Sequence, residues 1–264
     1  YRLIKMYGND TILRDYKSAI ASLRESELYK LHFSNDDFAE EKDFSLGGSE
    51  VSFPPSFKLI EKDIKGSERP VEYLQRRGVG WDIIESKKIG FTSFQETEKK
   101  SSFRIIIPSY DLNGDVNYWV GRDYLGNSKR MKYDNPKVEK KDIIFNELTL
   151  QWDADITLVE GPFDHIVVPN SVPLLGKALN ENFKLYWDLF TKANANINIF
   201  LDGDAFGTVK EIYKRLNHGS LYNRVRYIQV SGDDDPSSIY QRDGKRGIIS
   251  HLSAPRKIKE QYLG

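Results

Sequence analysis

The sequence predicts an α/β protein, with a mixed α+β segment in its first half and a parallel sheet in its second half. From residue 155 onward, short apolar runs alternate with amphipathic segments, a pattern typical of a parallel sheet covered on both faces. Before that point, aromatic and β-branched runs are separated by the turn sequences LNGD and LGNS, which favours antiparallel pairing. With 264 residues and 39% hydrophobic content, the chain can bury one large core or two modest ones.

The individual elements follow from local patterns. Residues 11–31 have apolar side chains at helical spacing, and the acidic stretch 34–50 that follows is typical of a linker. The sequence RPVEYLQRRGVGWDIIESKKIGF predicts two short helices, one from Pro70 to about Arg77 and one between Gly80 and Gly90. In the second half we expect strands at 155–161, 171–176, 197–204 and 224–231, and helices at 162–170, 180–194 and 205–219.

Charge and cysteine content narrow the function classes. Lys plus Arg equals Asp plus Glu at 39 each, so the net charge favours neither nucleic acid nor membrane. Residues 99–141 nevertheless hold ten basic and five acidic residues, whereas 151–210 hold four basic and eight acidic ones. This distribution suits a polyanion that docks beside a cation site, although a solvated surface is an equally ordinary explanation. The chain has no cysteine, which excludes disulfides and thiolate zinc sites within it.

Acidic residues follow three of the four strands predicted in the second half. They are Glu160 in VEG, Asp202 and Asp204 in FLDGDAFG, and Asp235 in GDDDPSS. If these strands are neighbours, the carboxylates converge at one edge of the sheet and repel one another unless a cation neutralises them. Oxygen ligands favour Mg²⁺ or Mn²⁺, and such sites carry out phosphoryl or nucleotidyl transfer. Each motif alone is also typical of a turn or a solvated loop, so the prediction depends on all three.

The residues around these acids suggest further roles. Gly161 and Gly203 would leave room for a bulky ligand against the backbone. His165 is the one histidine near the acids in sequence. Asp164, one helical turn past Glu160, would either support the site from behind or be a solvated acid at a helix end.

These residues resemble the TOPRIM domain, which bacterial-type primases share with topoisomerases and some nucleases. The family pattern of a glutamate-glycine, a D-x-D and a later acid is matched by Glu160, Asp202, Asp204 and Asp235. FLDGDAFG is similar to the primase sequence D-G-D-x-A-G, with Phe206 in place of the usual small residue. LLGKAL is similar to the family's L-G-x-A-L. DDDPSS is similar to the primase D-P-D segment, with a serine where the second acid would be.

The first half resembles the polymerase core of primases. VEYLQRRGVGWDIIESKKIGF, FRIIIPSYDLNGDVNYWVGRDY and KYDN each look like primase segments, and the spacing is most similar to phage-encoded primases. The resemblance spans about residues 53–245. It implies an N-terminal helical segment and linker at 1–52, a polymerase-core subdomain at 53–150, a Rossmann-like TOPRIM domain at 151–245 and a C-terminal tail at 246–264.

The resemblance also implies nucleotide-binding residues. Those that would hold template backbone or nucleotide phosphates are Arg104, Arg122, Lys132, Tyr133, Asn135 and Lys177. Their chemistry is suitable, because arginine offers phosphate a bidentate fork and an exposed tyrosine can stack on a base. Structural alternatives stay open: Arg104 capping a sheet edge, Lys132 solvated, and Tyr133 in a core.

The function implied by the resemblance is that of a DNA primase, which synthesises RNA primers on single-stranded DNA during replication. Glu160, Asp202 and Asp204 would be catalytic, and with Asp235 they would hold Mg²⁺ or Mn²⁺, without zinc in this chain. The partners would be single-stranded DNA, ribonucleoside triphosphates and, outside this chain, a zinc-binding module or a replicative helicase of the primosome. We expect a bacterial or phage-infected cytoplasm and no membrane. A TOPRIM nuclease and a catalytically silent module that binds single-stranded DNA or nucleotide are the alternatives.

The chain opens on Tyr1, which we interpret as the start of a fragment from which the zinc-binding module is missing.

Overall fold

The computed structural model describes residues 51–97, 99–126, 131–176, 179–259 and 261. The predicted helix at 11–31, the linker at 34–50 and Lys177 lie outside the described residues. The described parts of Val51–Asp111 and Val116–Gly264 belong to one compact unit, and the turn Leu112–Asp115 falls outside that unit.

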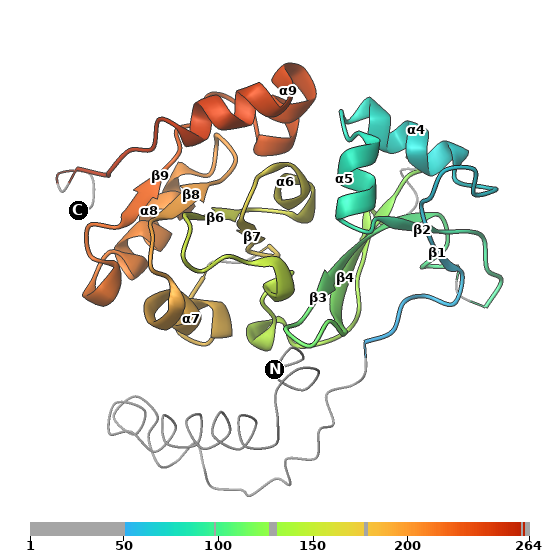
Figure 1. Ribbon diagram of the computed structural model, residues 1–264, viewed down its shortest axis with the longest axis horizontal. Helices are drawn as coiled ribbons and strands as arrows, with labels where there is room; N and C mark the ends of the chain where they lie inside the picture. The colour runs from blue at the N-terminus through green and yellow to red at the C-terminus, as the bar shows by residue number, and fades with distance from the viewer. Residues whose placement is uncertain (1–50, 98, 127–130, 177–178, 260, 262–264) are drawn as a thin grey trace, which may run out of the picture. The chain divides into compact units, whose positions relative to one another are not determined.

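The first half of this unit is built on a five-stranded antiparallel sheet in the order β1-β2-β3-β4-β5 (Figure 1). The strands are β1 (Phe57–Leu59), β2 (Gly90–Thr92), β3 (Arg104–Tyr110), β4 (Val116–Asp123) and β5 (Tyr133–Asp134). The predicted hairpin is present as the β3–β4 pair, and Gly114 in its turn has φ 83°, a conformation that favours glycine. Three short 3₁₀ turns lie elsewhere in the described chain, at Lys140–Asp142, Glu147–Thr149 and Gly219–Leu221.

Two short helices between β1 and β2 follow the sequence prediction. They are α4 (Glu68–Arg76) and α5 (Trp81–Ser86). Pro70 is accommodated in the first turn of α4, where its missing N–H has no partner to lose. The helix ends before Gly78, which has φ 76° and donates its N–H to the carbonyl of Gln75.

The second half is built on a four-stranded parallel sheet in the order β7-β6-β8-β9, which confirms the predicted fold class. The strands are β6 (Ile156–Val159), β7 (Ser171–Pro173), β8 (Ile197–Phe200) and β9 (Val225–Tyr227). The helices α6 (Pro162–Val167), α7 (Lys184–Lys192) and α8 (Phe206–Leu216) connect them.

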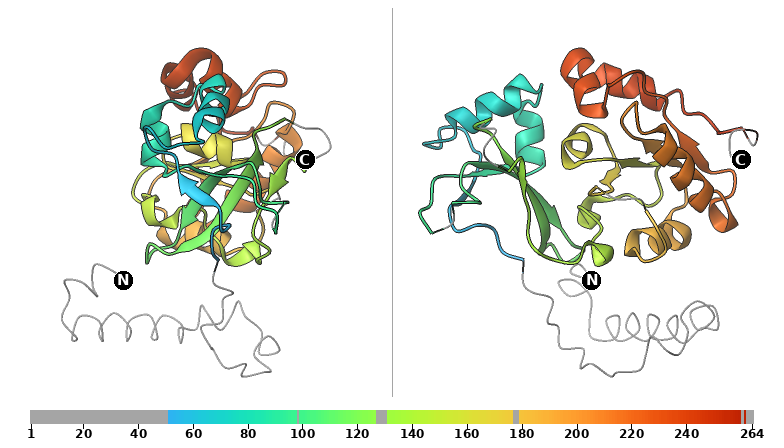
Figure 2. Two further views of the ribbon diagram at one scale, coloured as in Figure 1. Left: turned by 90° about the vertical axis from the view of Figure 1, so that its right-hand side faces the viewer. Right: turned by 180° about the vertical axis from the view of Figure 1, so that it is seen from behind.

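Both faces of the parallel sheet are covered, as the run of apolar residues in each strand predicted (Figure 2). Ile197 and Ile199 of β8 belong to a core cluster with side chains of α7 and α8. Phe200 of the same strand belongs to a second cluster, which includes side chains of α6. The alternation along β8 therefore separates two cores.

A long C-terminal helix, α9 (Pro236–Leu252), was not predicted; we expected a loop and then a tail from 246. It lies beside α6. Its start carries an ordinary signal, with Asp235 as N-cap and proline in the first turn. Glycine has a low helix propensity, so Gly244 argues against one continuous helix in the sequence, and in the structure its non-helical φ of 62° kinks the element into two helical stretches.

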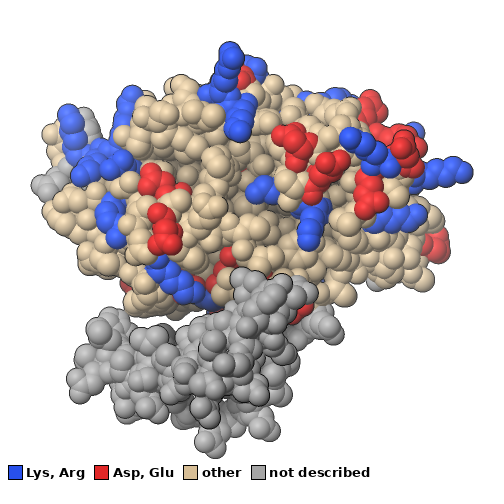
Figure 3. All heavy atoms as spheres, viewed as in Figure 1, with Lys and Arg blue, Asp and Glu red and all other residues tan. Residues whose placement is uncertain are grey.

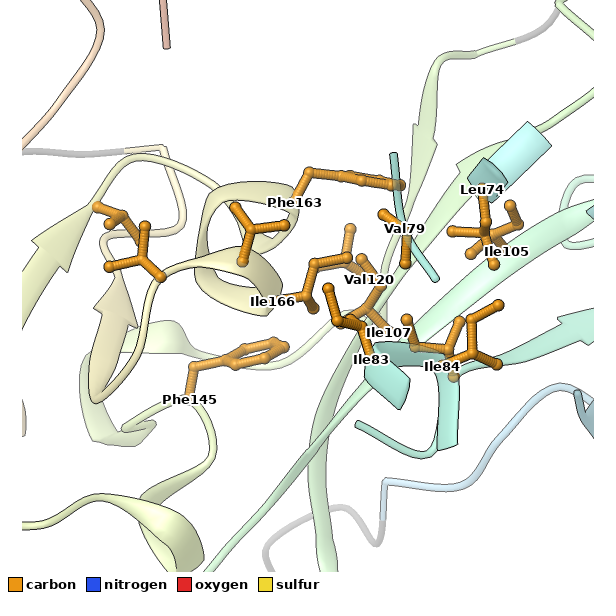
Figure 4. Close-up of a cluster of buried hydrophobic side chains, with 14 of the residues drawn as sticks. Leu74, Val79, Ile83, Ile84, Ile105, Ile107, Val120, Phe145, Phe163 and Ile166 are labelled. Carbon is orange, nitrogen blue, oxygen red and sulfur yellow. The ribbon is translucent and has the colours of Figure 1, made fainter. Parts of the chain in front are cut away.

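One hydrophobic core runs from the antiparallel sheet to α6 (Figure 4). Leu74 of α4 and Ile84 of α5 pack in the same cluster as Ile107 of β3, and all three are completely buried. Phe163 and Ile166 of α6 continue this cluster. The helix that follows the first acidic motif is thereby anchored to the antiparallel sheet.

Across the described ranges, no helix combines the length and the apolar character needed to cross a bilayer.

Candidate active site at the carboxyl edge of the parallel sheet

The acidic motifs lie at one edge of the parallel sheet because the strands that precede them are neighbours. Strand β8 pairs with β6 on one side and β9 on the other, all parallel. Glu160 directly follows β6, and Asp202 lies two residues past the end of β8. The loop after β9 leads to Asp235. The strand adjacency on which the sequence argument depended is therefore present.

The two acidic loops after β8 and β9 touch each other through glycine. The backbone N–H of Gly203 donates to the carbonyl of Asp234 at 2.9 Å. A Cβ atom on Gly203 would lie 2.2 Å from the carbonyl oxygen of Gly232. The expectation that Gly203 makes room for a ligand is therefore wrong, because the space is taken by the neighbouring loop. At Gly161 a Cβ atom would make only ordinary contact, 3.5 Å from Asp164 Oδ2.

Asp202 is the electrostatic centre of the acidic group. Burial, followed by the negative charges of Glu160, Asp235 and Asp204, raises the pKa of Asp202 to about 6. Its Oδ1 atom is buried and has no hydrogen-bond partner among the described residues. A bound cation would satisfy this oxygen and offset the repulsion, and carboxylate oxygens are the chemical type of donor that a hard divalent ion prefers.

The acids are near one another but not assembled around one point. Among the residues that the structure describes, no three or more His, Asp or Glu side chains are arranged to hold a metal ion. Glu160 and Asp204 are exposed, whereas Asp202 and Asp235 are half-buried. The side chains of the exposed pair are therefore accessible to solvent.

Asp164 is a buried acid that joins the loops of the site. Its residue is 7% exposed, and its carboxylate accepts hydrogen bonds from the backbone N–H groups of Gly161 at 3.0 Å and Ser237 at 3.2 Å. Burial and the nearby charge of Asp235 raise the pKa of Asp164 to about 7. Of the two expectations for this residue, the solvated acid is wrong. Asp164 connects the turn after β6 to the start of α9.

Two of the three acids that precede α9, Asp234 and Asp235, make different contacts. Asp235 caps α9 by accepting the N–H of Ser238 at 2.5 Å, and its charge reaches Asp202 and Asp164. Asp234 instead pairs with Arg242 at 2.9 Å. Asp235 is therefore the member of the run that is placed toward the other acids.

His165 belongs to the core and not to the acidic group. It is 3% exposed; Nδ1–H donates to the carbonyl of Ser171 at 3.0 Å, and Nε2 accepts from Asn146 Nδ2 at 3.1 Å. Burial, followed by the charge of Lys87, lowers the pKa of His165 to about 3. The ring is therefore neutral, with both nitrogens occupied.

Arg104 is buried, which corrects the prediction that it contacts phosphate. It is 1% exposed, and its guanidinium donates to the carbonyls of Lys100 at 3.0 Å and Met131 at 2.5 Å. The guanidinium is hydrogen-bonded to backbone carbonyls inside the fold and is not accessible to solvent. By holding the carbonyl of Met131, Arg104 positions the segment that carries Lys132 and Tyr133.

Arg122, Lys132 and Tyr133 lie together, as a nucleotide-binding surface requires. The guanidinium of Arg122 lies 4.9 Å from the ring centroid of Tyr133, and Nζ of Lys132 lies 5.7 Å from it. Tyr133 is 39% exposed, so the core alternative is wrong for this residue. Arg122 Nε also donates to the hydroxyl of Tyr73 at 3.0 Å, which fixes the orientation of the guanidinium.

Arg77 extends this arrangement toward the acids, and the sequence analysis missed it. Its guanidinium lies 5.6 Å from the ring centroid of Tyr73 and 4.7 Å from that of Phe163. Its Nη1 atom is 3.5 Å from the hydroxyl of Ser237. The two consecutive arginines before Gly78 could have indicated a phosphate-binding residue here, but two basic residues at the end of a helix are also typical of a solvated surface.

We call Arg77, Tyr73, Arg122, Tyr133 and Lys132 the basic–aromatic row. Alternating cationic and aromatic groups can hold phosphates and stack on bases. Figure 3 shows that basic and acidic side chains are interspersed on the face it displays. On the described part of that face, the basic side chains therefore do not form one continuous surface.

Of the remaining predicted contacts, Asn135 is half-buried and lies beside the hydroxyl of Tyr118, whose pKa is raised to about 12 by burial. Its proposed nucleotide contact stays a prediction, as does that of Lys177.

The described chain thus combines a five-stranded antiparallel sheet with a four-stranded parallel sheet that has acidic residues at its carboxyl edge. No protein-family model and no curated protein matches the chain. Among solved structures, however, it matches the Aquifex aeolicus primase (zinc-binding and RNA polymerase domains) with a TM-score of 0.60 and 20% identity, covering 73% of this chain and 57% of that one.

Two further solved structures of primase domains also match the fold of this chain. The DnaG primase catalytic domain bound to single-stranded DNA gives a TM-score of 0.56 and 18% identity, with 74% of each chain covered. The RNA polymerase domain of Mycobacterium tuberculosis primase DnaG gives 0.58 and 15%, covering 74% of this chain and 78% of that one. The fold is therefore that of the RNA polymerase domain of DnaG-type primases, which confirms the resemblance found in the sequence.

Because the two acidic loops touch at Gly203, we expect a side chain at this position to destabilise the fold. Gly203→Ala should lower the free energy of unfolding by about 1–3 kcal/mol, because the new methyl group overlaps the Gly232 carbonyl. The matched control is Gly207→Ala in the first turn of α8, where nothing lies within 4 Å of the added carbon. This control should be neutral or stabilising by up to about 1 kcal/mol. Urea denaturation of the three proteins measures both values, and equal stabilities would contradict the loop contact.

The buried neutral His165 predicts a loss of stability in mild acid. Its pKa is lowered in the folded state, so the unfolded chain takes up the extra proton first as the pH falls below 6.5. This group alone should reduce the free energy of unfolding by about 1.4 kcal/mol per pH unit in that range. Asp164 and Asp202 act with the opposite sign, because their raised pKa values favour the folded state at low pH, and this contribution is lost as the pH rises from about 4 to between 6 and 7.

The contribution of His165 can be separated by comparing the wild type with His165→Gln. Urea midpoints between pH 5 and pH 8 should fall less steeply toward acid in the variant. Identical slopes would show that His165 is not buried as a neutral ring.

Proposed function

We propose that this chain is the catalytic core of a DNA primase, which synthesises short RNA primers on a single-stranded DNA template by metal-dependent nucleotidyl transfer. The observation that carries the proposal is the meeting of Glu160, Asp202, Asp204 and Asp235 at the carboxyl edge of three adjacent parallel strands. The primase-core fold supports it.

In this proposal the four acids hold Mg²⁺ or Mn²⁺. Such an ion, when bound, stabilises negative charge on the reacting phosphates and makes a nearby hydroxyl more acidic. The 3′-hydroxyl oxygen of one ribonucleotide forms a bond to the α-phosphorus of the next, while the bond to pyrophosphate breaks. Asp202 and Asp235 are positioned by packing and capping, and Glu160 and Asp204 are exposed and can adjust to the substrate.

The basic–aromatic row would hold the nucleic acid or the triphosphate. Arg122 is oriented by Tyr73 and presents a fork that matches phosphate geometry. Tyr133 offers a half-exposed ring for a base, and Lys132 adds a point charge beside it. Asn135 and Lys177 complete the contacts implied by the resemblance.

The partners of this proposed core are single-stranded DNA and ribonucleoside triphosphates. Support comes from the matched structures: one is a DnaG catalytic domain bound to single-stranded DNA, and another is a DnaG domain with double-stranded DNA that has a 6-nucleotide overhang. A zinc-binding module or a replicative helicase, a phage origin and a place in the bacterial cytoplasm belong to the same proposal.

The test is synthesis of labelled RNA on single-stranded DNA, without a primer and with an annealed RNA primer, in Mg²⁺ or Mn²⁺. Asp202→Asn and Asp204→Asn should each reduce synthesis by about 100-fold or more, because charge stabilisation at the reacting phosphates is lost. Binding of single-stranded DNA should be retained. Glu211→Gln, an exposed acid on α8, is the control and should behave as wild type. EDTA should abolish synthesis.

The outcomes separate the alternatives. Extension without initiation would support the core and assign initiation to a module outside this chain. Cutting of the DNA that depends on Asp202 would replace the primase proposal with a nuclease. DNA binding without either reaction would indicate a catalytically silent binding module.

A further inference from the structure

A pocket beside Asp202 is not used by the roles described so far. Its volume is about 250 Å³, and it opens where β8, the start of α8 and the end of β9 meet. It is lined by the segment Leu201–Gly203, by Phe206 and Val209 of α8, and by Tyr227–Val230. Asp202 is thus shared between this pocket and the acidic group.

The pocket carries a pair of aromatic rings. Phe206 is the first residue of α8, and it is 44% exposed although it is a large apolar side chain. Its ring centroid lies 5.7 Å from that of Tyr227, with the two planes inclined at 59°. The backbone of Tyr227 is held by two hydrogen bonds of 2.8 Å with Arg256, so the second ring stands on a fixed strand.

The size and lining of the pocket indicate the kind of ligand. The volume is below the range of about 300–1,000 Å³ that holds a whole drug-sized molecule, so it suits a single ring system. Exposed aromatic faces gain most by stacking on another flat ring. The carboxylate at one end of the pocket belongs to the proposed phosphate-transfer site, which places a ring in the pocket within one nucleotide of the reacting groups.

We propose that this pocket binds a nucleobase, stacked on Phe206 and Tyr227, from a nucleotide that is held at the acidic group. This proposal rests on the proposed function, because it assigns a base-binding position to the same site. The base has two possible sources, the single-stranded template and a ribonucleoside triphosphate. Both offer the same heteroaromatic surface, and the experiment below distinguishes them.

The experiment measures binding and needs no catalysis. Wild type, Phe206→Ala and Phe206→Leu are titrated, in Mg²⁺, with ATP, with inorganic tripolyphosphate and with a fluorescent oligodeoxynucleotide. Both variants should weaken the binding of either ATP or the oligodeoxynucleotide by about ten-fold, because one base–ring stack is lost. Tripolyphosphate has no base, and its affinity should not change. Phe206→Tyr retains the ring and should bind as wild type.

Tyr222→Ala is the matched control, since Tyr222 is a 62% exposed aromatic residue that does not line the pocket. It should leave all three affinities unchanged. A selective loss of ATP binding in the Phe206 variants would identify the ribonucleotide as the source of the base, and a selective loss of DNA binding would identify the template. Unchanged affinities, or an equal loss for tripolyphosphate, would overturn the proposal.

Failure of this inference and failure of the proposed function have different signatures. If the wild type synthesises RNA and Phe206→Leu retains every affinity, only the base pocket is rejected. If base binding depends on Phe206 but no RNA is made on either template, only the primase reaction is rejected.

Discussion

The burial of closely spaced carboxylates is the constraint on which the arrangement of the acidic group depends. Glu160, Asp202 and the loop of Asp235 follow neighbouring parallel strands, so they lie at the carboxyl edge of the same sheet. Asp164, in the first turn of α6, is buried next to them. Burial, followed by the negative charge of neighbouring acids, raises the pKa values of Asp164 and Asp202, so the ionised forms of both groups are unfavourable here. The surrounding structure offsets this unfavourable energy with fixed hydrogen bonds, from Gly161 and Ser237 to Asp164 and from Ser238 to Asp235.

Helix α9 supplies part of the hydrogen bonding that stabilises these buried carboxylates. Its first turn supplies the N–H groups that Asp164 and Asp235 accept, and helix N-termini favour negative charge. Its start also meets the other half of the unit, because Arg77 after α4 reaches Ser237. The basic–aromatic row and the acidic group are therefore connected through side chains that pack against α6 and α9. This connection fixes the basic–aromatic row relative to the start of α9.

The parts of the fold that depend on residues close together in the sequence could be predicted. Apolar strands followed by acids indicated the parallel sheet and the edge at which Glu160 and Asp202 lie. The Asn113–Gly114 turn indicated the β3–β4 hairpin. These predictions succeeded because each depends on residues close in sequence and on the fixed geometry of parallel strands.

Features that depend on contacts between distant segments could not be predicted. Arg104 has the residue type of a phosphate ligand, and only the fold reveals that the carbonyls of Lys100 and Met131 surround it. Gly203 has the pattern of a ligand-approach glycine, yet the loop of Gly232 occupies the space. Helix α9 was missed because Gly244 argues against one continuous helix, and the partners that stabilise it lie far away in sequence.

The function proposed above requires the acids at this edge to hold a divalent cation. Calorimetric titration of the wild type and of Asp202→Asn with Mn²⁺ at pH 7, in two buffers of different ionisation enthalpy, tests it most directly. Saturable binding by the wild type with release of protons is expected, since cation binding competes with protons held by carboxyls of raised pKa. Asp202→Asn should lose most of this binding. Absence of saturable binding by the wild type, or equal binding by the variant, would show that Asp202 and its neighbouring acids do not form a cation site.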